Sequence, residues 1–594
     1  MTEFEAGAAA GAALPSAART GNLARRRLVF AALVVATIAA MMALATAALA
    51  ADGLGVRDVV LLALFLLTLP WTVIGFWNAV IGFVILRWAR NPSTTVTPAA
   101  ATVRGDEDIT SSIALLLCIR NEDPARLLRN LRPMLAGLAP VGDRFHLYLL
   151  SDTSEPAVAD AESAAFARLA EEWRGRIAVT WRRRADNTGF KAGNIRDFCA
   201  RFGAGHDLAV TLDADSFMPA AAVLRMVRIM QAAPEIGILQ GLVVGMPSTS
   251  AFARVFQFGM RLGMWSYTTG SAWWQGDCGP HWGHNSVLRL RPFTAHCAIP
   301  ELPGSGPLSG HVLSHDQIEA VLMRRAGFEV RVLVEDDLGW EENPPTLLEF
   351  IRRDIRWCQG NMQYWRLLTL PGLKLVSRYQ LAFAILMFLG SPAWIGLLVL
   401  GTLGVIAAPH AFVAPGPGQA VLVLETVMWF APKIATVIDA LTRRKARWRY
   451  GGGPLFLLNV AIETVFFLLL SPIMWCAHTI FLVALVLGRG VSWGGQARDG
   501  HTVPVPLAVA RLWPQTVLGW GAIAALALWA PAAIPCALLI AGGLALAVPL
   551  CVVTARRAAG LAAVRSGIGR LPEETGASPL DALGLEAVGL TPRK

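Results

Sequence analysis

The chain has 594 residues, of which 55% are hydrophobic and only 16% are charged. About a quarter of the residues of a soluble globular protein are charged, so this composition excludes an ordinary soluble protein and indicates one that spans a membrane. The formal net charge of +10 suits either a nucleic acid or an acidic lipid surface. Because the arginines gather beside apolar runs, we favour inner-membrane lipids and expect no nucleic-acid partner.

Two apolar runs lie near the start of the chain, at residues 28–50 and 59–86, and each is long enough to cross a bilayer. The first follows three arginines and ends in Ala48-Leu49-Ala50, a pattern that also resembles a cleavable signal peptide. Its apolar stretch is longer than the roughly 7–15 residues of a signal core, so we favour an uncleaved span. Residues 25–90 are therefore predicted to hold two transmembrane helices.

The C-terminal part, residues 378–555, contains the other apolar runs. They cover residues 380–408, 419–440, 454–488, 515–531 and 533–553. The run at 454–488 is too long for one ordinary crossing and is interrupted at Ser471-Pro472, which predicts two short crossings, or one crossing and an interfacial or re-entrant helix. With about six helices here, about eight transmembrane helices are expected in the chain.

Basic residues flank these runs and indicate their orientation. They are Arg25–Arg27, Arg87, Arg90, Arg443, Arg444, Lys445, Arg447, Arg449, Arg489, Arg498, Arg511, Arg556 and Arg557. Because positive charge marks the cytoplasmic side of the bacterial inner membrane, we expect the polar segment 105–370, the loops at 441–453 and 488–513, and both termini to be cytoplasmic. The tails at 1–24 and 556–594 are rich in small residues and are expected to be loose.

The segment 105–370 has a different pattern, in which short strand-like runs alternate with helical stretches. The runs are Ile113–Ile119, Phe145–Leu150, Ile177–Trp181 and Leu208–Leu212. This alternation predicts a mostly parallel α/β sheet. No glycine-rich dinucleotide or P-loop motif accompanies it, so neither of those nucleotide sites is supported.

Acidic residues follow the strands of this predicted sheet, at the edge where α/β sheets bind ligands. They are Glu122, Asp152, Asp213 and Asp215. A carboxylate pair such as Asp213 and Asp215 can hold Mg²⁺ or Mn²⁺ together with diphosphate oxygens, and the metal then neutralises charge on a departing diphosphate. Two aspartates with this spacing also arise by chance in a long chain, and the alternative is a solvated turn at a strand end.

Two further motifs offer a cation and a base. Lys191 begins a helix after Asn187-Thr188-Gly189, where small residues let the backbone approach a phosphate. Asp316, in Leu313-Ser314-His315-Asp316, is the best candidate for a general base that removes a proton from an attacking hydroxyl. The alternatives are a solvated lysine at an ordinary helix start, and a helix N-terminal acid favoured by the helix dipole.

A basic and aromatic stretch, residues 352–361, precedes the C-terminal apolar runs. Its guanidinium groups, Arg353 and Arg356, can clamp a diphosphate, and the indole of Trp357 can carry a sugar ring. The same composition suits a helix that anchors at the membrane interface.

Residues 273–285 combine tryptophans with histidines and follow a predicted interfacial helix at 252–267. We expect Trp273, Trp274 and Trp282 to wall an acceptor channel, and Asp277, His281 and His284 to hydrogen-bond sugar hydroxyls. Cys278, His281 and His284 have a spacing that suits zinc, but no fourth ligand is evident. A turn at the membrane interface is the other alternative.

The order of these motifs resembles the processive family 2 glycosyltransferases, such as cellulose and hyaluronan synthases. Longer phrases resemble more closely the glucosyltransferases of osmoregulated periplasmic glucan synthesis, OpgH/MdoH. They are GDCGPHWGHN (276–285), LSHDQIEA (313–320), VEDDLGWEENPPTLLEFIRRDIRWCQGN (334–361) and WGGQARDG (493–500). The resemblance covers about residues 20–555 and implies an α/β GT-A-like glycosyltransferase domain inserted in a polytopic α-helical membrane protein.

The resemblance also implies a role for each motif. Asp152 would bind the nucleotide, Lys191 the diphosphate and Asp213 the nucleotide-sugar. Asp215, with Asp213, would bind the metal, and Asp316 would be the base. Arg356 and Trp357 would hold diphosphate and acceptor. Arg353 stands where the general motif has glutamine, so the glutamine's role is not transferred.

The implied activity is an inverting, metal-dependent transfer of glucose from UDP-glucose to a growing linear β-glucan, with a β-1,2 backbone, coupled to export across the inner membrane. Some relatives are associated with acyl carrier protein, which stays a candidate partner together with periplasmic glucan-modifying proteins. One alternative is a synthase of a cellulose-like or hyaluronan-like polymer. The other is a transporter whose cytoplasmic segment is a regulatory nucleotide-binding domain.

Overall fold

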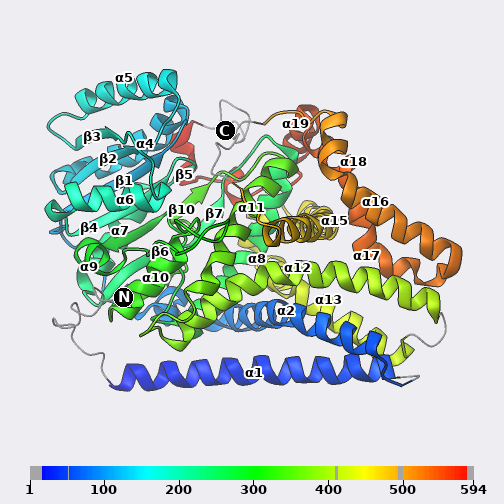
Figure 1. Ribbon diagram of the computed structural model, residues 1–594. Helices are drawn as coiled ribbons and strands as arrows, with labels where there is room; N and C mark the ends of the chain where they lie inside the picture. Colours follow the sequence, from blue (N-terminus) through cyan, green and yellow to red (C-terminus); the bar gives the residue numbers. More distant parts are fainter. Residues whose placement is uncertain (1–16, 51–52, 409–412, 492–499, 585–594) are drawn as a thin grey trace.

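The computed structural model describes residues 17–50, 53–408, 413–491 and 500–584. An α/β domain occupies one side of the molecule, and long apolar helices form the other side (Figure 1). The phrase at 493–500 lies, apart from its last residue, outside the described residues, as does the first part of the N-terminal tail.

The main sheet has seven strands in the order β3-β2-β1-β4-β8-β6-β9. Their bounds are β1 Ile113–Ile119, β2 Phe145–Ser151, β3 Ala178–Arg183, β4 Leu208–Asp213, β6 Ile236–Gly241, β8 Ser286–Arg289 and β9 Glu329–Leu333. Only β8 runs antiparallel to its neighbours, β4 and β6, and the other neighbouring pairs in this sheet are parallel. The predicted mostly parallel α/β sheet is therefore present.

The strands are apolar because helices cover both faces of the sheet. These helices are α4 Pro124–Leu138, α5 Pro156–Glu172, α6 Phe190–Arg201, α7 Ala220–Ala232, α9 Leu290–His296 and α10 Asp316–Arg325. Asp123 caps α4 as its position before Pro124 suggests, because its Oδ1 accepts a hydrogen bond from the Ala125 amide at 3.0 Å. Alternate residues of β1 point into two different apolar clusters, so each face of the strand is buried.

A second, three-stranded sheet in the order β5-β10-β7 lies beside the end of β4. Its strands are β5 Ser216–Phe217, β7 Val243–Gly245 and β10 Gly339–Glu341. Glu341 is paired with Ser216 in this sheet, and the Glu342 amide donates to the Asp215 carbonyl at 3.1 Å. The small sheet therefore brings β10 next to the Asp213-Ala214-Asp215 turn, although more than a hundred residues separate them.

The apolar helices number fewer than the eight expected. Six described helices are long and apolar enough to cross a membrane: α1 Ala17–Leu49, whose apolar part is Asn22–Leu49, α2 Val56–Trp88, α12 Leu375–Ala407, α13 Pro415–Thr442, α15 Gly453–Val486 and α16 Val505–Trp529. A pair bent by 53°, Pro531–Ala545 with Ala547–Thr554, could add a seventh; it contains α17 Ile534–Ala545 and α18 Ala547–Thr554. The remaining helices of this part are α3 Pro92–Val96, α14 Arg444–Arg449 and α19 Arg557–Ser566.

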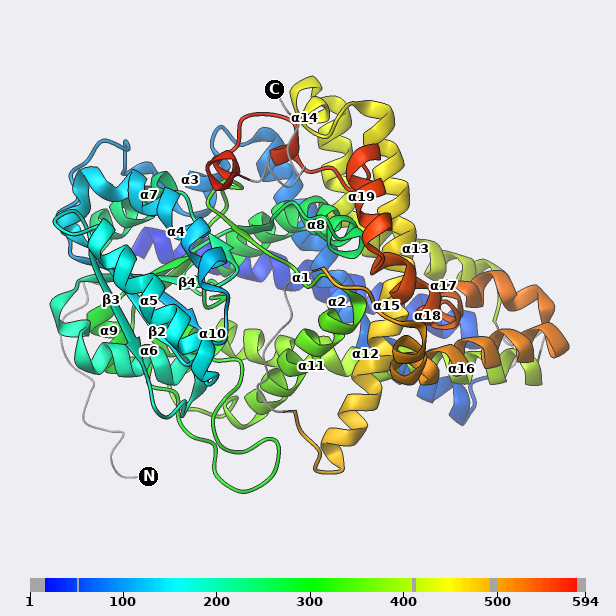
Figure 2. The same cartoon turned by 90° about the horizontal axis from the view of Figure 1, so that it is seen from above.

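The difference from the expected number arises in α15, where the predicted break at Ser471-Pro472 does not occur. The Ser471 hydroxyl donates to the Phe467 carbonyl at 2.8 Å, and such side-chain bonds let an apolar helix continue past a proline. Figure 1 looks nearly along α15, whereas α1, α2 and α12 lie lengthwise. Figure 2 shows α15 lengthwise and across α12, so α15 lies across these helices rather than beside them.

Helix α8 (Ala251–Gln275) extends beyond the interfacial helix predicted at 252–267 and is buried between the α/β domain and the apolar helices. It packs closely on α2 at two glycines. A Cβ at Gly82 would lie 1.8 Å from the Ser266 carbonyl oxygen, and one at Gly270 would lie 1.9 Å from that of Asn78. Helix α8 therefore joins the two parts of the molecule.

The composition of the C-terminal tail predicts a loose segment, but its described residues are packed against the rest of the protein. It returns to the α/β domain, where Leu580 and Leu583 pack against β5, β7 and β10. The Glu574 carboxylate accepts from the Arg254 guanidinium at 2.9 Å, and the Arg and Glu side chains are only 1% and 6% exposed. The prediction of a loose tail is wrong because buried arginines of α8 need acidic partners, and the tail supplies them. The composition of the tail alone does not show this requirement. At the other terminus, α1 already begins at Ala17, within the tail expected to be loose.

Replacing Glu574 by alanine would leave the Arg254 charge buried with its main partner removed. We expect Glu574→Ala to destabilise the protein by about 3–5 kcal/mol, measured from the thermal unfolding of the purified full chain followed by tryptophan fluorescence. Glu171→Ala is the matched control, because it removes an exposed ion pair with Arg174 and is expected to leave the unfolding midpoint nearly unchanged. Equal effects of the two substitutions would contradict a stabilising C-terminal contact.

Candidate active site

The carboxyl ends of the central strands bring the predicted donor-site residues together. Asp152 directly follows β2, and Asp213 is the last residue of β4. Lys191 lies in the first turn of α6, the helix that follows β3. Because β3, β2, β1 and β4 are parallel neighbours, these residues meet along one edge of the sheet.

Asp152 is held by an arginine that the sequence analysis missed. The Arg184 guanidinium donates from Nε to Asp152 Oδ1 at 2.8 Å and from Nη2 to Oδ2 at 2.6 Å. Both side chains are less than 10% exposed, and the Asn187 amide donates to the Asp152 carbonyl at 2.7 Å. Arg184 comes directly after β3, so a cation at the end of a strand was the available signal. The pair fixes the carboxylate that is the candidate nucleotide ligand.

Lys191 forms an ion pair with Asp213 and donates a hydrogen bond to the Gly283 carbonyl at 2.8 Å. Burial by itself would lower the pKa of Lys191, but the neighbouring carboxylate of Asp213 raises this pKa above its ordinary value. The lysine is therefore a fixed positive charge at the strand edge, as a diphosphate site requires. The structure brings together two motifs that are 22 residues apart in sequence.

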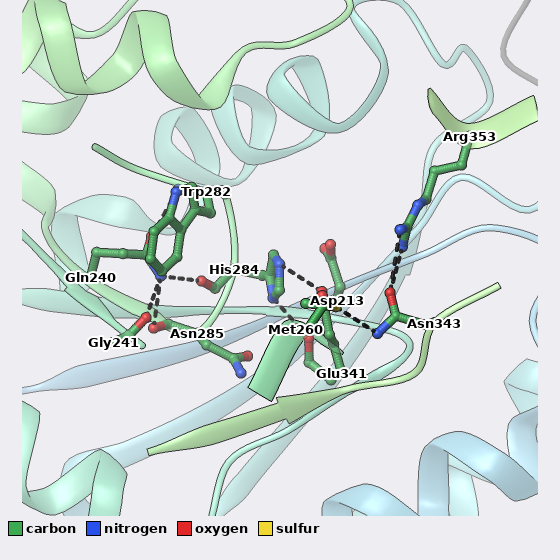
Figure 3. Close-up of polar contacts among 12 residues, drawn as sticks. Asp213, Gln240, Gly241, Met260, Trp282, His284, Asn285, Glu341, Asn343 and Arg353 are labelled. Atoms are coloured by element: carbon green, nitrogen blue, oxygen red, sulfur yellow. Dashed lines mark hydrogen bonds and ion pairs between the residues drawn. The ribbon is translucent and has the colours of Figure 1, made fainter. Parts of the chain in front are cut away.

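Residues 281–285 form a loop that is anchored by Gln240, at the end of β6 (Figure 3). The Gln240 amide nitrogen donates to the His284 carbonyl at 2.9 Å, and its oxygen accepts from the Trp282 amide at 2.8 Å. His281 is 1% exposed and its Nδ1 lies 3.0 Å from the same oxygen, so it supports the loop from inside. His284 points the other way, toward Glu341.

One further acidic side chain lies near the predicted metal site. Glu341, which the sequence analysis missed, lies with its Oε2 3.5 Å from His284 Nε2. Burial raises the pKa of Glu341, His284 and Arg353 lower it, and the nearby carboxylates of Asp215 and Asp213 raise it. Carboxylates this close favour a divalent cation, so these residues fit Mg²⁺ or Mn²⁺.

Among the residues that the structure describes, no group of three or more His, Cys, Asp or Glu side chains is assembled as a metal site. The zinc alternative at Cys278, His281 and His284 therefore has no support here. A site with few protein ligands suits Mg²⁺ or Mn²⁺ instead, because a bound diphosphate supplies the remaining oxygens.

Asp316 is the first residue of α10 and lies beside the donor-site residues. Gly283 lies between Asp316 and Lys191. A Cβ added to this glycine would lie 3.3 Å from Asp316 Cβ and 3.6 Å from Lys191 Nζ. Behind the candidate base, His315 Nδ1 lies 2.9 Å from the buried Glu319 carboxylate. The candidate base and the candidate diphosphate ligand thus face one backbone segment.

Helix α11 (Leu347–Gln363) carries the basic and aromatic stretch. The Arg353 guanidinium donates from both Nη atoms to Asn343 Oδ1 at 3.3 Å (Figure 3). It also lies over the Trp357 ring, at 4.7 Å from the centroid. Trp357 is 47% exposed, so part of its indole is accessible to a ligand. Arg353 thus orients the indole, which gives a local function to the residue that replaces the usual glutamine.

Three candidates of the 273–285 stretch have structural partners instead of an open face. Asp277 forms ion pairs with Arg27 and Arg324. Trp274 donates to the Asn78 side chain at 3.0 Å and stacks on Phe30, while Arg26 lies over Trp273. These residues fasten α1 and α2 to the α/β domain. Trp282 packs in an apolar cluster with residues of α2 and β9.

Comparisons with known proteins agree with this arrangement. Residues 208–432 match the model of glycosyl transferase family group 2. The chain is 35% identical over 537 residues to glucans biosynthesis glucosyltransferase H of Pseudomonas putida, which covers 86% of this chain and 62% of that protein. The protein of the same name from Cupriavidus pinatubonensis is 35% identical over 547 residues, covering 88% and 62%.

Among solved structures, the mannosyltransferase PcManGT from Pyrobaculum calidifontis, in complex with GDP-Man and Mn²⁺, aligns with 61% of this chain and 99% of its own. The TM-score is 0.36 and the sequence identity is 15%.

Residues 208–432 are therefore similar to the family 2 glycosyltransferases, in a chain that combines a mixed α/β sheet with six described helices long and apolar enough to cross a membrane. More particularly, the chain is a homologue of the glucans biosynthesis glucosyltransferases H, which confirms the resemblance found in its motifs. The chain spans 62% of the length of these relatives.

Gly283 tests the packing around the candidate base and lysine. Its φ of +81° and its close neighbours mean that a methyl group would both strain the backbone and push on Asp316 and Lys191. We expect Gly283→Ala to lower glycosyl transfer by about tenfold or more, the effect of 1–3 kcal/mol of strain. Gly175→Ala is the control, since Gly175 has φ +75° but no atom near its added Cβ. Full activity of Gly283→Ala would contradict the assigned site.

Proposed function

We propose that the chain is an inverting glucosyltransferase that transfers glucose from UDP-glucose to a growing linear β-glucan. The observation that carries the proposal is the convergence of Lys191, Asp213 and Asp316 around Gly283, within a family 2 domain. Homology to glucan-synthesis glucosyltransferases supports glucose as the transferred sugar and glucan as the acceptor. A β-1,2 backbone follows from the resemblance in the long motifs.

The donor occupies the edge formed by β2, β4 and α6 in this proposal. Asp152, fixed by Arg184, binds the nucleoside, with Glu122 at the end of β1 beside it. Lys191 binds the diphosphate, because it is a buried cation held at the strand edge. When bound, Mg²⁺ or Mn²⁺ on Asp215 and Asp213 neutralises charge on the leaving UDP.

Asp316 acts as the general base toward the acceptor. Its carboxylate takes the proton of an acceptor hydroxyl as the hydroxyl oxygen attacks the anomeric carbon of glucose. The bond from that carbon to the diphosphate oxygen breaks, and the electron pair leaves with UDP. A single in-line displacement inverts the configuration and requires no covalent enzyme intermediate. Fixing both substrates in this geometry supplies much of the rate.

The acceptor approaches from α11 in this arrangement. The accessible part of the Trp357 indole stacks on the glucan end, as indole faces do on sugar rings, and Arg356 on the same helix contacts the diphosphate side. His284, near Glu341, borders the space between donor and acceptor. The supporting positions of Asp277 and His281 make them parts of the framework in this proposal and not acceptor ligands.

Membrane orientation follows from charge. If α15 lies along the interface, the crossings are α1, α2, α12, α13, α16 and the bent pair α17–α18. The basic clusters at 25–27, 87–90, 443–449 and 556–557 then all fall on one side, which the positive-inside rule makes cytoplasmic. We propose that UDP-glucose is used on this side and that glucan leaves through the helices of the C-terminal part.

The purified full chain in detergent, supplied with UDP-[¹⁴C]glucose, tests this function. We expect radioactive polymer, and linkage analysis is expected to give 1,2-linked glucose. Another linkage would favour a cellulose-like or hyaluronan-like synthase. Substrate transport without sugar transfer would favour the transporter alternative.

Asp316→Asn keeps the shape of the candidate base but removes its basicity. We expect polymer formation to fall by at least about 10²-fold, the usual scale of general base catalysis, while UDP-glucose binding is retained. Asp186→Asn is the control, because Asp186 bonds only to Thr188 within an exposed turn. Wild-type polymer formation by Asp316→Asn would contradict the base assignment.

Removing the divalent cation tests the other half of the site. We expect EDTA to abolish transfer and Mg²⁺ or Mn²⁺ to restore it, because charge on the leaving diphosphate then lacks a counterion. Asp215→Ala is expected to raise the metal concentration needed for half-maximal activity. Full activity in excess EDTA would contradict a metal-dependent mechanism.

A further inference from the structure

Asp354 lies inside the basic and aromatic stretch of α11, between Arg353 and Arg356, and the proposed transfer reaction gives it no part. Its Oδ2 is 2.6 Å from Nε2 of His478, which belongs to the transverse helix α15. The other ring nitrogen of His478 lies 3.0 Å from the hydroxyl of Ser391 on α12. One imidazole therefore joins α11, α15 and α12.

The imidazole has a partner for each of its polar atoms. Nε2–H donates to Asp354, and Nδ1 accepts from the Ser391 hydroxyl. The side chains of His478 and Asp354 are only 8% and 17% exposed, and the ring of Phe388 packs edge-on against His478 at 5.0 Å between centroids. A hydrogen bond to a carboxylate in such an enclosed place is stronger than one in water.

Apolar side chains surround this polar contact and tie the same helices together. Cys358 and Met362 of α11 pack with Phe388 of α12 and with Phe481 and Leu482 of α15. The Asn361 amide donates to a carbonyl of α12 at 3.3 Å. Helix α11 thus rests on two apolar helices over one face, and the Asp354–His478 hydrogen bond lies within that contact.

The end of α11 holds the loop that carries the candidate base. The Gln363 side chain accepts from the Leu313 amide at 2.9 Å and donates to the His311 carbonyl at 3.1 Å. The Tyr364 hydroxyl donates to the Ser314 carbonyl at 2.8 Å. At Gly360 an added Cβ would lie 2.4 Å from Ser314 Oγ, so helix and loop are in close contact.

Helix α11 therefore lies between the base and the apolar helices, as Figure 2 shows with α10 on one side of α11 and α15 and α12 on the other. Three of the proposed donor-site residues stand elsewhere. Asp152 follows β2, Asp213 ends β4, and Lys191 lies in the first turn of α6. A displacement of α11 would move the base loop, Trp357 and Arg356 while leaving Asp152, Lys191 and Asp213 in place.

We propose that His478 is a positioning residue for chain elongation. By holding Asp354 it fixes α11 against α15 and α12, so that Trp357, Arg356 and the Asp316 loop keep one geometry each time the glucan advances by a sugar. Loss of this contact lowers the number of sugars added to one chain more than it affects donor binding. The inference rests on the proposed function, since it concerns repeated transfer to one acceptor.

The test compares His478→Ala, Asp354→Ala and the double variant, each as the full chain in detergent. Thr479→Ala is the matched control, because this neighbour on α15 bonds only to a carbonyl of its own helix, that of Trp475. Asp354→Asn is the conservative variant, since its amide oxygen still accepts from Nε2–H of His478. Size-exclusion profiles select the variants that fold.

The measurements are the product length distribution, the amount of glucan formed per UDP released, and KM for UDP-glucose. We expect both single substitutions to lower mean product length and glucan per UDP by about tenfold, the scale of one lost charged hydrogen bond. KM for UDP-glucose is expected to stay within about twofold, because Asp152, Lys191 and Asp213 are held by the main sheet and α6, and Arg356 is the one proposed diphosphate contact that α11 supplies. The double variant is expected to be no worse than either single one, as for partners in one contact.

Asp354→Asn is expected to keep most of the wild-type product length, because it keeps the hydrogen bond to His478. If the residue served only to fill space, Asp354→Asn and Asp354→Ala would shorten the product equally. Wild-type product length in His478→Ala or Asp354→Ala would overturn the proposal, as would additive effects in the double variant or a parallel loss of donor affinity. If His478→Ala does not fold, the comparison of Asp354→Ala with Asp354→Asn decides the matter alone. A wild-type chain that forms no glucan from UDP-glucose overturns the proposed function instead.

Discussion

A buried charge must find a partner, and this constraint organises the junction between the two parts of the molecule. Helix α8 carries Arg254 and Arg261 into a region that excludes water, where they are 1% and 7% exposed. Glu574 pairs with Arg254, and Glu573 with Arg261 at 2.9 Å. The far end of the chain must therefore return to α8, and its hydrophobic residues then cover the small sheet.

The same constraint acts at the strand edge, where it produces a binding site and not only a framework. Arg184 fixes Asp152, and Lys191 is fixed between Asp213 and Gly283. These groups are oriented before a substrate arrives, so little of the binding free energy is spent on ordering them. The small sheet adds Glu341 to the same edge. Because the Glu341 carboxylate lies near those of Asp213 and Asp215, their mutual repulsion favours binding of a divalent cation.

On the membrane side, the transverse direction of α15 decides how the candidate active site is connected to the apolar helices. A helix that ran beside α12 would touch the α/β domain only at one end. Because α15 lies across α12, its first turns contact α8 and its last turns contact α11. The helix that carries Trp357 is thereby fastened to apolar helices over several turns, and His478 of α15 contacts Asp354 on it.

Much of this protein is determined by local sequence. Hydrophobic length predicted the apolar helices, strand-like alternation predicted the parallel strands, and the ends of those strands indicated Asp152 and Asp213, because these patterns depend on residues that are neighbours in the chain. Tertiary structure alone decided the rest. Arg184, Glu341 and Asp354 act through partners that are distant in sequence, Asp277 is drawn into two ion pairs, and the C-terminal tail folds because it meets buried arginines. Hydropathy also indicates the length of an apolar helix but not its direction. The sequence of residues 454–488 therefore did not predict that α15 is one continuous helix lying across its neighbours.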